Sequence, residues 1–153
     1  MKECPRKTIF SKPDQKKIFE EIKNFVLNDL LPNPKINKII MFGSLVKGTF
    51  GKYDKPFKHR MYSDVDILLL VENNFIIPKK WKLHFSCDLY DVFNITNLGK
   101  KFLIQYMVCR KKNYKNKKHQ KEAEKCGVPL LLTKSRNKYI VLYEKKSKLW
   151  LKP

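Results

Sequence analysis

Several patterns that mark familiar sites are missing from this sequence of 153 residues. Its four cysteines form no Cys-x-x-Cys pair, and none of its three histidines has a partner at metal-ligand spacing, which argues against zinc. No Gly-Lys-Ser or Gly-Lys-Thr is present, which excludes a P-loop. No apolar run approaches the length of a membrane span, and residues 1–10 lack the apolar core of a signal peptide. We therefore expect a cytoplasmic protein that has no membrane partner.

Acidic residues are scarce beside basic ones. The chain has 14 Asp and Glu against 34 Lys and Arg, which gives a formal net charge of +20. Such a charge attracts polyanions at moderate salt and favours nucleic acid as a partner. Lysine greatly outnumbers arginine, as it also does in proteins from AT-rich genomes, so the charge has a second explanation.

The basic charge is concentrated in two segments. Residues 51–62 interleave cations with aromatic rings, a pattern that suits a phosphate backbone and its bases but also a solvated loop whose rings join the core. Residues 110–125 fit either a solvated helix face or a phosphate-binding surface. No repeat or long linker divides the chain, so we expect one domain over 1–153, with a core at about 13–111 and a basic extension at about 112–153.

Helical spacing of apolar residues predicts the helices. The spacing covers 13–30, and Pro32 and Pro34 end that segment. A shorter apolar stripe predicts a C-terminal helix over 102–110.

Apolar runs and alternation predict the strands. The apolar run 39–42 predicts a strand over 36–42, and 64–71 carries apolar residues on both faces, as expected of a central strand. Polar and apolar residues alternate over 81–93, which predicts one continuous strand. Two further apolar segments predict a C-terminal hairpin, 128–132 with 139–143.

Two aspartates open the predicted strand 64–71. Because strand side chains alternate between faces, Asp64 and Asp66 are expected side by side on one face. Two carboxylates so close repel each other unless a cation lies between them, and oxygen-only ligands suit Mg²⁺ or Mn²⁺. The alternative is a pair of solvated residues at the end of a strand.

A Gly-Ser turn follows the predicted strand 36–42. Gly43 permits a sharp turn, and Ser44 is placed to cap the helix after it. Backbone N–H groups at the head of a helix favour anions, and Lys47 adds a positive charge one turn later. The turn is therefore a candidate site for a triphosphate, and we add Ser63, which precedes the aspartates, to the nucleotide-binding candidates.

The order Gly43-Ser44, then Asp64-x-Asp66 at the start of the next strand, resembles the nucleotidyltransferase superfamily that includes DNA polymerase beta. The resemblance covers about 36–93 and is looser over 98–115. It implies an α/β (α+β) fold, with a short mixed sheet packed against helices. It also implies transfer of a nucleoside monophosphate from a nucleoside or deoxynucleoside triphosphate with the help of two metal ions. Many small members have a shorter connection between the turn and the aspartates, so 51–62 is expected to be an insertion.

The resemblance further implies a third carboxylate on a neighbouring strand. Asp88 lies on the polar face of the predicted strand 81–93, and Asp88-Leu89-Tyr90 resembles the Asp-Leu-Phe found at this place in small family X polymerases. Asp91 is the alternative, and would face the other way if the strand ran unbroken. The predicted catalytic and magnesium-binding residues are therefore Asp64, Asp66 and Asp88.

The sequence thus predicts a magnesium-dependent nucleotidyltransferase whose acceptor, on the evidence of charge, is the end of an RNA or DNA. Three alternatives stay open. One is a nucleotidyltransferase that modifies a protein or a small molecule, as enzymes of toxin–antitoxin pairs and antibiotic-adenylylating enzymes do. The second is a nucleic-acid-binding module without catalytic activity, and the third is a subunit whose basic face binds a protein partner. Few residues follow the third carboxylate, so we expect transfer without a template.

Overall fold

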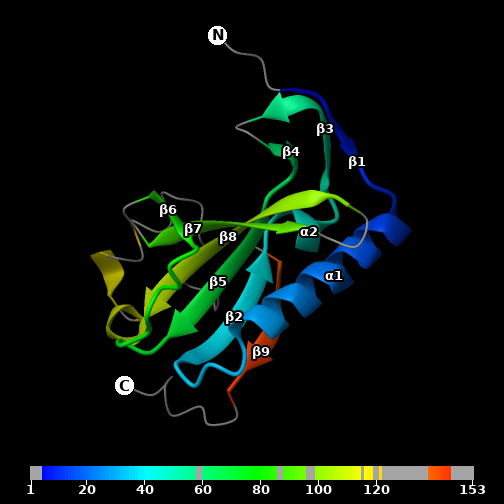
Figure 1. The fold of residues 1–153 in the computed structure, drawn as a ribbon. Coiled ribbons are helices and arrows are strands. Elements are labelled where there is room, and N and C mark those ends of the chain that lie inside the picture. The colour runs from blue at the N-terminus through cyan, green and yellow to red at the C-terminus, as the bar shows by residue number, and fades with distance from the viewer. Residues whose placement is uncertain are drawn as a thin grey trace.

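The computed structural model describes residues 5–57, 60–85, 88–95, 99–114, 116–118, 121 and 138–145. Strands dominate these residues and form two sheets, so the fold is of the mixed α and β kind (Figure 1). The larger sheet orders its strands as β6 (Lys82–Phe85), β7 (Leu89–Ile95), β8 (Lys101–Arg110), β5 (Val65–Val71), β2 (Ile36–Phe42) and β9 (Tyr139–Glu144). The smaller sheet orders them as β1 (Lys7–Ile9), β3 (Gly51–Phe57) and β4 (Arg60–Tyr62).

The helix α1 (Lys12–Leu30) covers one face of the larger sheet and confirms the helix predicted over 13–30. The hydroxyl of Ser11 accepts a hydrogen bond from the backbone N–H of Asp14 at 3.3 Å, which caps the helix, and Pro13 occupies its first turn. Its buried stripe then packs on the sheet through Ile18, Ile22, Val26 and Leu30. Each such side chain stabilises the fold by about 1.5–3 kcal/mol through burial.

Strands β2, β5 and β8 form the centre of the larger sheet. β2 pairs antiparallel with β5, and β5 pairs parallel with β8. Their side chains are buried on both faces: Ile39 and Ile67 belong to the core under α1, whereas Ile40 and Leu68 belong to a second cluster on the opposite face. The strands predicted over 36–42 and 64–71 are thus confirmed, and both are central.

The helix predicted over 102–110 is wrong, because this segment is strand β8. Phe102 and Ile104 are buried on the α1 side, and Leu103 and Met107 are also buried. Burial on both faces removes the period-two signal, and a continuous apolar run then has the same pattern as a buried helix. Pairing with β5 and β7 on either side decides the outcome.

The segment 81–93 is a hairpin of β6 and β7 instead of the single strand predicted for it. Asp88 adopts a positive φ of 60° immediately before β7 and ends the regular alternation. In β7, Leu89 pairs with Met107 and Asp91 with Gln105. Asp91 therefore lies on the face opposite α1, contrary to the orientation that an unbroken strand predicts.

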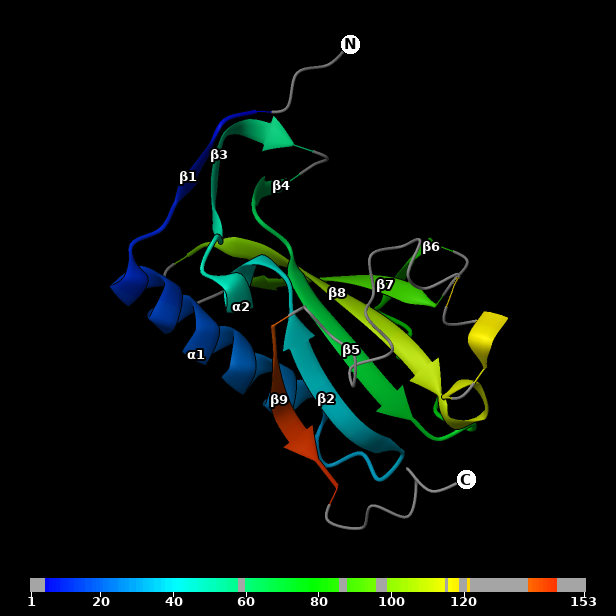
Figure 2. The same ribbon diagram turned by 180° about the vertical axis from the view of Figure 1, so that it is seen from behind.

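The segment 51–62 supplies β3 and β4, and β3 pairs with β1 on one side and with β4 on the other. This small sheet stands beyond the end of the larger sheet at which the one-turn helix α2 (Ser44–Lys47) lies (Figures 1 and 2). Phe10 and Tyr62 join it to the core, since Phe10 stacks on Phe50 and Tyr62 contacts the edge of Phe102.

The C-terminal prediction is tested only in part. The segment 139–143 is a strand, β9, and it pairs antiparallel with β2 at the edge of the sheet. Its predicted hairpin partner, 128–132, and most of the tract 110–125 lie outside the described residues, although a 3-10 turn, η1, covers Lys111–Asn113. Within the described chain, no helix has the length and apolar character that a membrane crossing needs.

Tyr106 offers a test of the core. Its side chain is fully buried, with its ring stacked on Trp81 at 4.5 Å, and its hydroxyl has no hydrogen-bond partner in the described part of the chain. We expect Tyr106→Phe to raise the free energy of unfolding by about 0.5–1.5 kcal/mol, because it removes a buried unpaired hydroxyl. Urea denaturation measures the change.

Tyr114→Phe is the matched control for this test. The hydroxyl of Tyr114 donates to the carbonyl of Val71 at 3.0 Å and accepts from Asn37 at 3.3 Å. Its removal should lower the free energy of unfolding by about 1 kcal/mol. Equal destabilisation by the two substitutions would contradict the assignment for Tyr106.

Candidate functional site

The Gly-Ser turn and the first residues of β5 meet at one end of the larger sheet. Phe42, the last residue of β2, pairs with Asp66 of β5. The turn that leaves β2 therefore lies beside the carboxylate of Asp66, and the structure brings Gly43 and Asp66 together although 22 positions separate them in the sequence.

Two separate constraints require glycine at position 43. Gly43 has a φ of 82°, in the region that side chains rarely adopt. A Cβ placed on it would overlap Oδ2 of Asp66 and lie 3.1 Å from the Cγ of that residue. The backbone of the turn thus occupies the space directly against the carboxylate, which only a residue without a side chain permits.

Asp66 is a half-buried residue whose carboxylate has an unusually high proton affinity. The pKa of Asp66 is raised from 3.8 to about 8. Burial of the carboxylate is the largest cause, and the nearby charge of Asp64 is the second. Arg60 and Lys47 act in the opposite direction, and their effects are smaller. Two carboxylates at the head of one strand therefore repel each other, and a cation between them would relieve both the burial and the repulsion.

Asp64 directly precedes β5 and is paired with a cation from the small sheet. Nη2 of Arg60 lies 4.0 Å from Oδ1 of Asp64, and both side chains are largely shielded from solvent. The Nε of Arg60 is buried and has no hydrogen-bond partner among the described residues. Arg60 of β4 thus places a positive charge beside Asp64. The sequence did not indicate this role for Arg60.

Ser44 and Lys47 lie on the one-turn helix that follows Gly43. The prediction that Ser44 caps this helix is wrong. Gly43 is the N-cap residue, and no side chain caps the helix by a hydrogen bond. The Oγ of Ser44 is buried and without a hydrogen-bond partner in the described chain. Lys47 is exposed, and its charge acts on Asp66. Of these two residues, Lys47 is therefore the one whose charge acts on the carboxylate of Asp66.

Ser63 holds the backbone of Gly51 by two hydrogen bonds. It is buried, its hydroxyl accepts a hydrogen bond from the N–H of Gly51 at 3.1 Å, and its own N–H donates to the carbonyl of Gly51 at 2.9 Å. Ser63 therefore fixes the start of β3 against the segment that leads into β5. The structure does not bring this hydroxyl to an open site.

The structure does not bring Asp88 to the aspartate pair. Its carbonyl accepts the N–H of Val108, and Val108 pairs with Leu69, which lies three residues farther along β5 than Asp66. Its Oδ1 accepts the hydroxyl of Tyr90 at 2.9 Å. Asp88 is thus placed farther along the sheet than the end where the turn lies.

Asp91 lies in the same row as Asp66. Gln105 of β8 pairs with Asp66 on one side and with Asp91 of β7 on the other, so the three side chains share one face. Nε2 of Gln105 donates to Oδ1 of Asp91 at 3.1 Å, and Nδ1 of His84 lies 2.6 Å from Oδ2 of Asp91. Two strand spacings of about 4.8 Å separate the backbones of Asp66 and Asp91.

The row therefore contains Asp91, which the sequence offered only as an alternative, and Gln105, which the sequence analysis missed. Gln105 was missed because 102–110 was predicted as a helix; its polar side chain within an apolar run was the available signal. In the described chain, no group of three His, Cys, Asp or Glu residues is arranged to hold a metal. The residues able to hold a cation are Asp64 and Asp66, and its other ligands would be water or phosphate oxygens.

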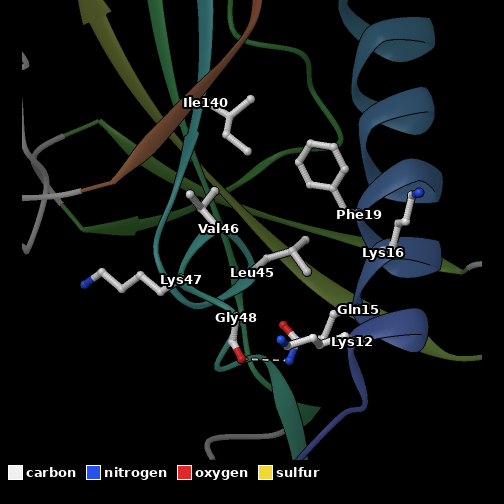
Figure 3. Close-up of a pocket in the computed structure, with 9 residues that line it drawn as sticks. All are labelled: Lys12, Gln15, Lys16, Phe19, Leu45, Val46, Lys47, Gly48 and Ile140. Atoms are coloured by element: carbon white, nitrogen blue, oxygen red, sulfur yellow. Dashed lines mark hydrogen bonds between the residues drawn. The ribbon is translucent and has the colours of Figure 1, made fainter.

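A separate pocket of about 410 Å³ opens on the other side of the turn (Figure 3). Phe19 of α1, Leu45 of α2 and Ile140 of β9 give it an apolar wall, and Lys12, Lys16 and Lys47 also line it, although the amine of Lys47 extends away from the other lining residues. Gln15 of α1 fixes one side by donating to the carbonyl of Gly48 at 2.7 Å. Neither Asp64 nor Asp66 lines this pocket.

The raised pKa of Asp66 predicts a pH-dependent stability. Between about pH 4 and pH 8 the folded chain holds a proton on Asp66 that the unfolded chain has released, so this group makes the free energy of unfolding fall as pH rises. We expect Asp66→Asn to remove that fall and to stabilise the protein by about 1–3 kcal/mol at the upper end of the range.

Urea denaturation of both proteins across this range measures the effect. The control is Asp54→Asn, a substitution of an exposed aspartate in β3. A stability difference between the wild type and Asp66→Asn that stays constant with pH would contradict the expectation.

No protein-family model matches this chain, and a search of curated proteins finds no match either.

Proposed function

We propose that the protein is a metal-dependent nucleotidyltransferase that moves a nucleoside monophosphate from a nucleoside or deoxynucleoside triphosphate to the end of a nucleic acid. The observation that carries the proposal is the junction between Gly43 and Asp66. A glycine backbone lies directly against the half-buried carboxylate of Asp66, which has a second carboxylate, Asp64, as its neighbour. A triphosphate would bind at the Gly43 turn, and a divalent cation would bind between the carboxylates of Asp64 and Asp66.

The metal assignment is supported by the chemistry of Asp64 and Asp66. Burial and mutual repulsion disfavour the ionised form of Asp66, and a divalent cation would stabilise it. Mg²⁺ or Mn²⁺ suits a pair of carboxylates whose remaining ligands are phosphate oxygens. When bound, such an ion neutralises charge on the phosphates and makes the reacting phosphorus more electrophilic.

The triphosphate is assigned to the turn and α2. The buried hydroxyl of Ser44 has no partner in the described chain and can donate to a phosphate oxygen. The exposed amine of Lys47 can pair with the same group. Both residues position the nucleotide, and positioning with charge neutralisation supplies most of the rate in phosphoryl-type transfer.

The transfer itself exchanges one phosphorus–oxygen bond for another. The acceptor hydroxyl forms a bond to the α-phosphorus, the bond from that phosphorus to the bridging oxygen breaks, and pyrophosphate leaves. The proton of the hydroxyl needs a base. Asp91 is the third carboxylate that we now favour over Asp88, because it shares a face with Asp66 and is held by Gln105 and His84.

A transfer assay tests the proposal. Purified protein receives Mg²⁺ or Mn²⁺, each α-labelled triphosphate in turn, and RNA or DNA as acceptor. We expect label on the nucleic acid, and a loss of about 100-fold or more in Asp64→Asn and Asp66→Asn. Asp91→Asn should lose more activity than Asp88→Asn. Label on protein alone would reassign the acceptor, and no label on any acceptor would overturn the proposal.

Gly43→Ala tests the turn against a matched control. Gly43 and Gly48 have φ values of 82° and 81°, but a Cβ at Gly48 meets nothing within 4 Å, whereas one at Gly43 meets Asp66. The two substitutions share the backbone cost, so their difference isolates the contact with the carboxylate. We expect Gly43→Ala to lower the transfer rate about 100-fold relative to Gly48→Ala. Equal rates would show that the contact is irrelevant to the site.

A further inference from the structure

The small sheet carries two aromatic rings that are not part of the core. The rings of Tyr53 and Phe57 contact each other, with 5.2 Å between their centroids, and both remain partly exposed. The other rings of this region behave differently: Phe50 and Tyr62 pack against Phe102. Packing in the core therefore explains Phe50 and Tyr62, but it does not explain Tyr53 and Phe57.

Cations flank these two rings on both sides. Lys7 of β1 pairs with Tyr53 and is exposed, and the guanidinium of Arg60 lies 5.5 Å from the centroid of Phe57. We call these four residues, Lys7, Tyr53, Phe57 and Arg60, the ring platform. Lys7 has no ion pair with any described residue, so its charge is available to an anion.

The ring platform leads to the candidate catalytic pair. Tyr53 contacts Phe57, Phe57 contacts Arg60, and Nη2 of Arg60 lies 4.0 Å from Oδ1 of Asp64. A series of contacts thus runs from an exposed lysine, over two rings, to a carboxylate of the site. Three strands of one small sheet supply it, and the segment between β4 and β5 is two residues long.

We infer that the ring platform binds single-stranded nucleic acid and leads its end to Asp64. Bases stack on partly exposed aromatic rings while neighbouring cations pair with phosphates, and this combination binds single strands with little sequence preference. A duplex hides the faces of its bases in its own stack, so the two rings favour an unpaired acceptor. The delivery of the end to Asp64 rests on the proposed nucleotidyl transfer, whereas the binding surface does not.

Binding is measured apart from transfer, by fluorescence anisotropy of labelled oligouridine and oligothymidine of about 12 nucleotides, and of a hairpin duplex with the same charge. We expect the single strands to bind more tightly than the duplex. Tyr53→Ala and Phe57→Ala should each weaken single-strand binding about 10-fold, and Tyr53→Phe should restore most of the affinity because stacking needs only the ring.

Lys7 and Lys52 form a matched pair of exposed lysines on opposite faces. Lys52 pairs with Thr8 and Lys7 with Tyr53, so Lys52 faces away from the ring at position 53. Lys7→Ala should reduce the slope of log affinity against log salt concentration by about one, which corresponds to one phosphate contact. Lys52→Ala should change this slope less. Melting temperatures equal to that of the wild type establish that each variant is folded.

The outcomes separate this inference from the proposed function. Asp66→Asn should abolish transfer and leave binding intact, since Asp66 is not part of the ring platform. If no transfer is found but Tyr53→Ala still weakens single-strand binding, the catalytic proposal fails and the binding surface stands. Duplex binding as tight as single-strand binding, or unchanged affinity in both Tyr53→Ala and Phe57→Ala, would overturn the inference.

Discussion

The contact between the backbone of Gly43 and the carboxylate of Asp66 is the constraint on which the candidate site depends. It requires β2 and β5 to be neighbours in a fixed register, because a shift of one residue would turn Asp66 to the face under α1. Apolar side chains on both faces of these strands set that register. The core therefore positions the site, and the cost of burying Asp66 is offset by packing elsewhere.

Local patterns predicted the helix over 13–30 and the two central strands, because each has a stop signal and an unambiguous period or apolar run. The sequence failed where tertiary pairing decides: 102–110 is buried on both faces and so has no strand period. The prediction of a single strand over 81–93 also failed at Asp88. This residue has a positive φ without being a glycine, so nothing in the sequence marked the break that changes the face on which Asp91 lies.

The segment 51–62 links the proposed binding surface to the candidate site. Its composition fits either a loop whose rings join the core or a surface for nucleic acid. In the structure Tyr62 packs inward, whereas Tyr53 and Phe57 stay partly exposed. Arg60 belongs to the same small sheet and lies beside Asp64, so this one segment contributes to the proposed surface and to the candidate site.

The strand that precedes the turn takes its two neighbours from very different parts of the chain. β2 pairs on one side with β5 and on the other with β9, so that Lys38 lies opposite Glu144. Contacts at such sequence separation close large loops and slow the search for the native state. The edge of the sheet next to Gly43 is therefore expected to consolidate late in folding, after α1, β2 and β5 have already collapsed. The pairing of β9 with β2 would then appear as the last kinetic phase, behind the main change in secondary structure.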